Sequence, residues 1–183
     1  MRKLTHSQIV ARQQERSRQP RLPFTVVLND IRSLHNVGSI FRTCDGVGVR
    51  KLWLCGITGY PPNQRLAQTA LGAECAVPWE YRQDVVALLK ELKTGGYQIV
   101  FLEQMAESLP YDAFIPQPPV CLVVGNEIEG VSSGIISLCD AAIDIEMAGL
   151  KNSLNVSVAF GIVAYHFRAR FSRKITPSFL GKL

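Results

Sequence analysis

The sequence predicts a single α/β domain with a mostly parallel sheet of about six strands and helices on both faces. Short apolar segments alternate along the chain with stretches whose apolar residues have helical spacing, which is typical of strand–helix–strand units. The chain has 183 residues and is 47% hydrophobic, which is enough for the core of one domain. It contains no internal repeat and no low-complexity segment.

A basic helix and a buried strand are expected at the start of this domain. Residues 2–21 have Ile9 and Val10 as their only apolar pair, and Pro20 ends the helix. Phe24–Leu28 is mostly apolar, which is typical of a buried strand in a parallel sheet.

A helix and a second strand follow. Asn36 can cap a helix that begins at Val37, and Gly46 and Gly48 close it. Lys51–Cys55 is the next strand, and the intervening helix makes the two strands parallel. Because these glycines end the helix instead of opening it, they do not form a dinucleotide-binding motif, which disfavours an oxidoreductase.

The middle of the chain continues the alternation. We expect a short helix that starts at residues 61–63 and ends near Leu71, a strand at Cys75–Val77, and an amphipathic helix at Asp84–Lys93. Tyr97–Leu102 is the next predicted strand.

The last third supplies a central strand and the longest apolar helix. A proline-rich connector at 110–119 precedes Val120–Val124, which is apolar on both faces, as a central parallel strand should be. A short helix is expected at 132–139, a strand end at Ile143–Ile145, and a helix from Ser153 to about Phe171.

Charge divides the chain into a body and two ends. Residues 1–21 carry six Lys/Arg and one Glu, and residues 165–183 carry five Lys/Arg and no acid. We expect a basic N-terminal arm (1–21), a domain (22–172) and a basic C-terminal tail (173–183). The pattern fits nucleic acid held by the ends, but also two solvated tails that keep the protein soluble.

Composition limits the other classes of protein. No apolar run reaches the length of a membrane span and no secretory signal is visible, so we expect a cytoplasmic protein. The five cysteines form no Cys-x-x-Cys pair, which favours buried thiols in a reducing compartment. Cysteine and histidine lack ligand spacing, so no metal is expected.

Polar residues follow several predicted strands, at the edge where open α/β sheets bind ligands. Each has an ordinary explanation when taken alone: a helix cap, a solvated helix face or a loop acid. These residues are Asn36, Arg42, Glu103, Glu127, Ser153 and Asn155.

Three of these segments together resemble the signature motifs of the SpoU–TrmH family of RNA ribose methyltransferases, in the SPOUT superfamily. Asn-x-Gly-x-x-x-Arg at 36–42 resembles the first motif and Gly-x-Glu-x-x-Gly at 125–130 the second. Met-x-Gly-x-x-x-Ser-Leu-Asn-Val-Ser at 147–157 resembles the third. The likeness spans roughly residues 24–168, and the chain has Glu146 where the family usually has proline.

The resemblance implies a fold and a reaction. It implies a C-terminal trefoil knot, S-adenosylmethionine as methyl donor and an RNA ribose 2′-hydroxyl as acceptor. It also implies a homodimer with the last helix at the interface; that helix is apolar around much of its circumference, which equally suits burial in the monomer core. The short basic arm favours tRNA over ribosomal RNA. A catalytically silent RNA-binding factor on the same scaffold is the other alternative.

The resemblance also assigns roles to single residues. Arg42 is expected to be the general base, to hold the adjacent phosphate, or to stabilise the forming alkoxide. The last role suits a guanidinium that stays protonated better than the role of base. Asn36 and Glu127 are expected to orient Arg42 and the ribose. Ser153 and Asn155 are expected to position the hydroxyl or the nearby loop.

A dry pocket of apolar side chains and backbone groups suits the cofactor. The expected cofactor-binding residues are Leu102, Glu103, Gly125, Asn126, Ile145, Met147, Gly149 and Leu154. The expected RNA-binding residues are Arg12, Arg16, Arg32 and Arg168.

Overall fold

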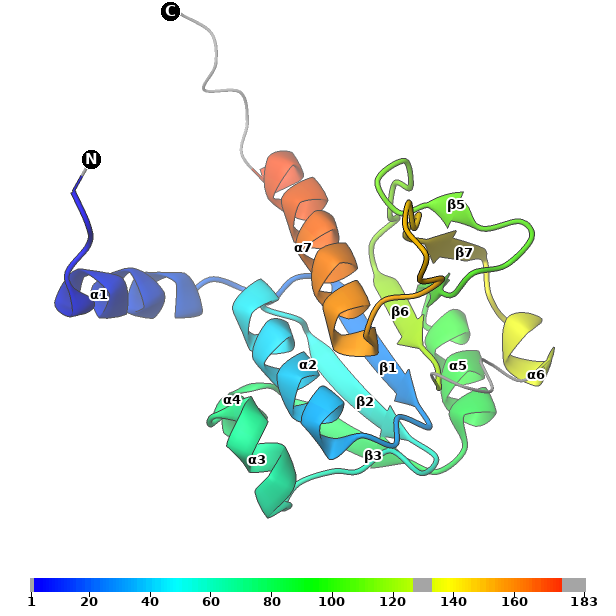
Figure 1. Ribbon diagram of the computed structural model, residues 1–183, viewed down its shortest axis with the longest axis horizontal. Helices are drawn as coiled ribbons and strands as arrows, with labels where there is room; N and C mark the ends of the chain where they lie inside the picture. Colours follow the sequence, from blue (N-terminus) through cyan, green and yellow to red (C-terminus); the bar gives the residue numbers. More distant parts are fainter. Residues whose placement is uncertain (1, 127–132, 176–183) are drawn as a thin grey trace, which may run out of the picture.

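Seven parallel strands form the sheet in the computed structural model, which describes residues 2–126 and 133–175 (Figure 1). They lie in the order β3-β2-β1-β6-β4-β7-β5. The predicted parallel sheet is therefore confirmed, with one strand more than expected. The strands are β1 (Phe24–Asn29), β2 (Lys51–Cys55), β3 (Trp79–Arg82), β4 (Gln98–Leu102), β5 (Leu109–Pro110), β6 (Val120–Val124) and β7 (Ala141–Asp144).

Helices cover both faces of this sheet, as the sequence predicts. One core holds buried residues of α2, α3, α4 and α7 against the sheet, and the other holds buried residues of α5 and α6. Every residue of β1 and β6 is buried, as is typical of central strands. The helices in the described residues are α1 (His6–Ser17), α2 (Leu34–Val47), α3 (Gln64–Ala70), α4 (Ala73–Ala76), α5 (Val85–Thr94), α6 (Ser133–Ile136) and α7 (Val156–Ile175).

The centre of the sheet contains a topological switch point. β1 and β6 are neighbours, yet the chain leaves β1 through α2 on one face and reaches β7 from β6 through α6 on the other. In open α/β sheets the loops at the carboxyl ends of such strands diverge and leave room for a ligand. A ligand site is therefore expected at the segments that follow β1 and β6.

The helix after β1 starts earlier than the sequence predicts. Ser33 caps α2, because its hydroxyl accepts a hydrogen bond from the backbone N–H of Asn36 at 3.2 Å. The prediction that Asn36 caps a helix starting at Val37 is therefore wrong. Asn36 lies in the first turn instead, where its side chain is available for another contact.

Gly38 allows α3 to pack closely against α2. A Cβ at Gly38 would overlap the hydroxyl of Thr69 and lie 2.5 Å from the backbone oxygen of Leu66. The Thr69 side chain can rotate, but the Leu66 carbonyl belongs to the backbone of α3 and cannot move alone. The glycine of the first motif is thus required for helix packing.

Gly38→Ala is expected to destabilise the fold. The overlap with α3 outweighs the gain in helix propensity, and we expect a net loss of about 2 kcal/mol. For a domain of this size, the melting temperature in a thermal unfolding scan should fall by about 5 °C. Gly134→Ala is the matched control, because a Cβ there meets only a methyl group of Val86 at 4.0 Å. An unchanged melting temperature for Gly38→Ala would contradict the packing role.

The edge strand β3 lies later in the chain than predicted. The expected strand at Cys75–Val77 is wrong, because α4 occupies residues 73–76 and the strand begins at Trp79. β3 alternates half-buried aromatic and charged side chains, which suits an edge strand that pairs on one side. The two-residue β5 was likewise not predicted, at the start of the proline-rich connector.

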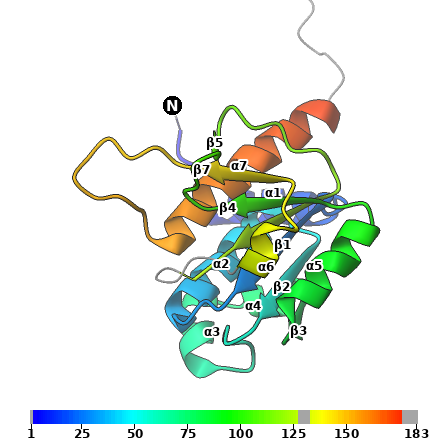
Figure 2. The ribbon, with the colours of Figure 1, turned by 90° about the vertical axis from the view of Figure 1, so that its right-hand side faces the viewer.

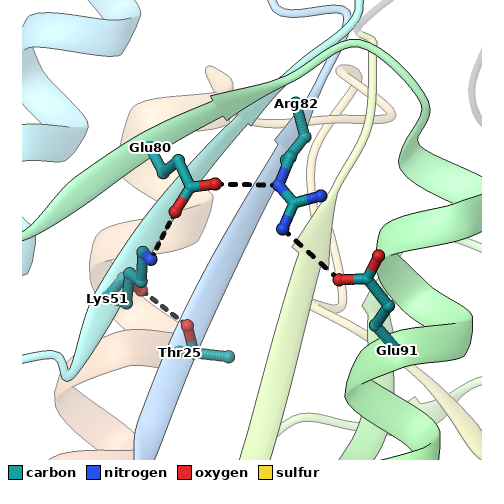
Figure 3. Close-up of polar contacts among 5 residues, drawn as sticks. All are labelled: Thr25, Lys51, Glu80, Arg82 and Glu91. Atoms are coloured by element: carbon teal, nitrogen blue, oxygen red, sulfur yellow. Dashed lines mark hydrogen bonds and ion pairs between the residues drawn. The ribbon is translucent and has the colours of Figure 1, made fainter.

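Charged side chains cover one face of this sheet edge (Figure 3). Glu80 pairs with Lys51 at 2.7 Å and with Arg82 at 2.8 Å, and Arg82 also reaches Glu91 of α5 at 3.4 Å. The hydrogen bond from Lys51 holds the pKa of Glu80 below its ordinary value. Such exposed pairs contribute little stability each, so their main effect is to keep the edge of the sheet charged.

The N-terminal helix stands apart from the sheet (Figure 1). α1 is shorter than the predicted helix over 2–21 and buries no side chain. At the other end, α7 continues past the predicted Phe171 to Ile175 and so crosses the domain boundary expected at 172. Within the described residues, no helix is both long and apolar enough to cross a membrane.

The cysteines are all free thiols. Cys44, Cys55 and Cys121 are buried, as expected, whereas Cys75 is exposed. Burial raises the pKa of Cys55 and of the half-buried Cys139 to about 12, so neither is a ready nucleophile at neutral pH.

Candidate active site

A pocket opens at the carboxyl ends of β4, β6 and β7, against the start of α7. It lies at the sheet edge where parallel α/β folds bind ligands. Most of the predicted cofactor residues line it, namely Leu102, Glu103, Gly125, Asn126, Ile145 and Leu154. The other two, Met147 and Gly149, do not line it; Met147 is half-buried and Gly149 is exposed.

The pocket also has lining residues that the sequence analysis did not select. Of the polar ones, Gln104 follows β4 and Asp144 is the last residue of β7. A charged residue at the end of an apolar strand is the sequence signal that could have identified Asp144. The apolar ones come from β6 and the first turn of α7. These residues are Gln104, Val124, Asp144, Val156 and Ala159.

Asn155 joins the first and third motifs. Its side-chain nitrogen donates to the side-chain oxygen of Asn36 at 3.2 Å, across 119 residues of sequence. Its own side-chain oxygen accepts from the backbone N–H of Ser157 at 3.0 Å, so Asn155 also caps α7. The helix therefore starts at Val156 and not at Ser153. The capping and the functional interpretations of Asn155 do not exclude each other.

Asn126 fixes the end of β6 to the end of β1. Its side-chain nitrogen donates to the backbone oxygen of Asp30 at 3.1 Å, and Asn126 is 5% exposed. The Asp30 carboxylate in turn accepts from the backbone N–H of Ile57 at 2.9 Å. This chain of contacts ties the loops after β6, β1 and β2 together on one side of the molecule.

The remaining predicted catalytic residues have different surroundings. Ser153 is exposed and lines the pocket. Arg42 is exposed on α2, about 9 Å beyond Asn36 along the helix axis at 1.5 Å per residue. It does not line the pocket, and its side chain makes no hydrogen bond or ion pair with the described residues. Glu127 lies outside the described residues.

The predicted RNA-binding arginines also differ. Arg12 and Arg16 are exposed on α1, and Arg32 is exposed just before α2. Arg168 instead donates to the backbone oxygen of Val47 at 2.6 Å, at the C-terminal end of α2. A cation is favourable there, because the last carbonyls of a helix lack partners and carry partial negative charge. Arg168 therefore has a structural contact that the sequence did not reveal.

The loop between β7 and α7 extends away from the sheet (Figure 2). Its far side is held by Gln104, whose side-chain nitrogen donates to the backbone oxygen of Asn152 at 2.7 Å. At its base, the Ser108 hydroxyl donates to the Asp144 carboxylate at 2.6 Å. The loop is thus connected at two points to the segment that follows β4.

Sequence comparison finds similarity to RNA methyltransferases. The SpoU rRNA methylase family matches residues 23–165. The tRNA (guanosine(18)-2′-O)-methyltransferase of Aquifex aeolicus is 36% identical over 151 residues, which cover 81% of this chain and 70% of that protein.

Solved structures with a similar fold are also RNA-modifying enzymes. The A. aeolicus TrmH/SpoU tRNA modifying enzyme aligns with a TM-score of 0.80 and 33% identity, over 92% of this chain and 85% of that one. The AdoMet-bound rRNA methyltransferase from Sinorhizobium meliloti aligns with a TM-score of 0.75 and 27% identity. That alignment covers 84% of this chain and 57% of the S. meliloti chain.

Proposed function

Because this chain belongs to the SpoU family of S-adenosylmethionine-dependent RNA 2′-O-methyltransferases, we propose that it methylates a ribose in tRNA. We further propose that the residues around the pocket perform the transfer. The hydrogen bond between Asn36 and Asn155 is the observation that carries this second proposal, because it joins two of the three family motifs next to the pocket.

The pocket has the chemistry that the cofactor requires. Leu102, Ile145 and Leu154 offer apolar surface for an adenine ring, and the backbone at Gly125 offers hydrogen-bonding groups for its edge. The carboxylates of Glu103 and Asp144 suit a ligand with positive charge. The residues present therefore fit S-adenosylmethionine.

The transfer requires an activated hydroxyl. Bound S-adenosylmethionine would supply an electrophilic methyl group on its sulfonium, and the 2′-hydroxyl would release its proton to water as its oxygen takes up the methyl group. Ser153 and Asn155, at the pocket and at the start of α7, are placed to hold the ribose. Arg42 stabilises the negative charge that develops on the oxygen, since its guanidinium stays protonated.

A second copy of the chain completes the site. Arg42 does not line the pocket of its own chain, which is why we assign the approach of Arg42 to the pocket to a partner subunit. One face of α7 packs into the core, but the opposite face leaves Val158 51% exposed and Tyr165 54% exposed. Two apolar faces on one helix suit burial on two sides, and we assign the outer one to a homodimer.

The basic arm is the proposed contact with the rest of the RNA. Arg12 and Arg16 lie on a helix with no buried residue, so their charges are available to phosphates. Similarity to a tRNA enzyme favours tRNA, and ribosomal RNA is the alternative, because a similar structure belongs to an rRNA methyltransferase. The C-terminal knot stays a prediction, as does a cytoplasmic location, which free thiols support.

Nucleoside mass spectrometry tests the function. Purified protein, S-adenosylmethionine and unmodified tRNA are incubated, and the digest is analysed for 2′-O-methylated nucleosides, with ribosomal RNA as the parallel substrate. We expect a methylated nucleoside that maps to one tRNA position and is absent without cofactor. Methylation of ribosomal RNA alone would reject the tRNA assignment. Cofactor binding by calorimetry with no methylated product would point to a silent RNA-binding factor.

A further inference from the structure

Among the described residues, the charged side chains that line the pocket are both acidic. They are the carboxylates of Glu103 and Asp144, and the other described lining residues are apolar or neutral. A partly enclosed site with one sign of charge favours ligands of the opposite sign, because water screens the interaction less there than in bulk solution.

Asp144 is the carboxylate that the fold holds in place. The Ser108 hydroxyl lies 2.6 Å from one carboxylate oxygen of Asp144 and 3.0 Å from the backbone oxygen of Met105. The backbone of Asp144 is fixed as well, because its oxygen accepts from the N–H of Tyr111 at 2.9 Å. The Glu103 carboxylate is held less firmly, because it accepts from the backbone N–H of the next residue, Gln104, at 3.0 Å. A charge that cannot move away from a ligand acts on it most strongly.

The ligand in this pocket changes charge during the reaction. S-adenosylmethionine carries one net positive charge, since its sulfonium and ammonium groups outweigh one carboxylate. S-adenosylhomocysteine, the product, is neutral overall. We propose that Asp144, positioned by Ser108, makes the pocket discriminate between the two by charge, so that the cofactor binds more tightly and the product leaves more easily. This inference rests on the proposed function.

Binding of charged and neutral ligands measures the discrimination directly. Isothermal titration calorimetry gives the Kd of S-adenosylmethionine, S-adenosylhomocysteine and sinefungin, whose protonated amine replaces the sulfonium. Asp144→Asn keeps the shape of the side chain and one oxygen that can accept from Ser108, but removes the charge. We expect it to lower the ratio of the product Kd to the cofactor Kd by about tenfold. Sinefungin should follow the cofactor, because the two have the same charge.

The control variants separate charge from structure. Glu146→Gln removes an exposed acid two residues further along, which does not line the pocket, and should leave all three affinities unchanged. Asp144→Glu keeps the charge and should keep a ratio above one. If Asp144→Asn fails to fold, raising NaCl on the wild-type protein should weaken the cofactor more than the product.

Each other outcome has a clear meaning. Equal weakening of all three ligands by Asp144→Asn shows a contact with a shared group such as the ribose, and overturns the proposal. An unchanged ratio overturns it as well. If the wild-type protein binds both ligands and Asp144→Asn changes neither affinity, the charge discrimination is rejected but the proposed function is not. If the wild-type protein binds neither ligand, the charge discrimination and the proposed function are both rejected.

Discussion

Replacing Arg42 with alanine is expected to slow methyl transfer by about 100- to 1,000-fold at saturating RNA and cofactor, which is the usual cost of losing one oxyanion-stabilising group. The ribose hydroxyl is barely acidic, so its oxygen gains negative charge only if a fixed cation is close. Single-turnover transfer of a labelled methyl group to tRNA measures this step without product release. Calorimetry should show an unchanged cofactor Kd, because the proposed role of Arg42 is on the ribose oxygen and not on the cofactor.

Two further arginine variants test whether the loss of rate depends on the charge and the position of Arg42. Arg42→Lys keeps the charge but not the planar fork, and we expect it to recover part of the rate. Arg50→Ala removes another exposed arginine, just before β2 and so at the amino ends of the strands, and should retain the full rate. An Arg42→Ala enzyme with the normal rate and normal RNA affinity would remove Arg42 from the mechanism.

Val158→Glu is expected to disrupt the proposed homodimer and leave a monomer. Val158 lies on the outer face of α7 and is 51% exposed in the single chain, so the charge should not disturb the monomer fold. In a two-fold interface the substitution buries two unpaired carboxylates, which costs several kcal/mol. The dimer Kd measured by analytical ultracentrifugation should rise by at least about a hundredfold.

Loss of the dimer should also abolish methylation if Arg42 acts in the partner's site. Ala87→Glu is the matched control, because it adds the same charge to an exposed helix position on α5, away from α7. We expect that variant to sediment and to methylate like the wild type. A monomeric Val158→Glu variant with full activity would show that each subunit works alone.

Strand positions could be predicted where burial is complete. β1 and β6 are buried along their whole length, and β6 is apolar on both faces. β3 was missed because its residues are only half-buried, so its aromatic and charged side chains give a weak signal at a sheet edge. The two residues of β5 form a strand only because β7 is there to pair with them.

Predictions from neighbouring residues failed where a side chain bonds to a residue far away in the sequence. Ser33 and Asn36 can both cap a helix, and the sequence cannot rank them. In the fold, the Asn36 side chain bonds to Asn155, so Ser33 is the residue left to cap α2. Asp144 was overlooked for the same reason: its partner Ser108 is 36 residues away and becomes a neighbour only when β5 pairs with β7.

Periodicity also could not orient the last helix. Leu154, Val158 and Tyr165 recur at helical spacing, yet they are exposed, whereas Phe160 and Phe167 form the buried face. Both faces are apolar, so the hydrophobic pattern predicts a helix without telling which side meets the sheet.

The contact between Asn36 and Asn155 has a consequence for synthesis of the protein. Its two residues are 119 positions apart, and the second lies beyond all seven strands. A nascent chain that has left the ribosome only as far as β7 can pair every strand and still lack the cap of α7 and one wall of the pocket. Modification of RNA by this protein must therefore wait for late translation, when the strands have already had time to assemble.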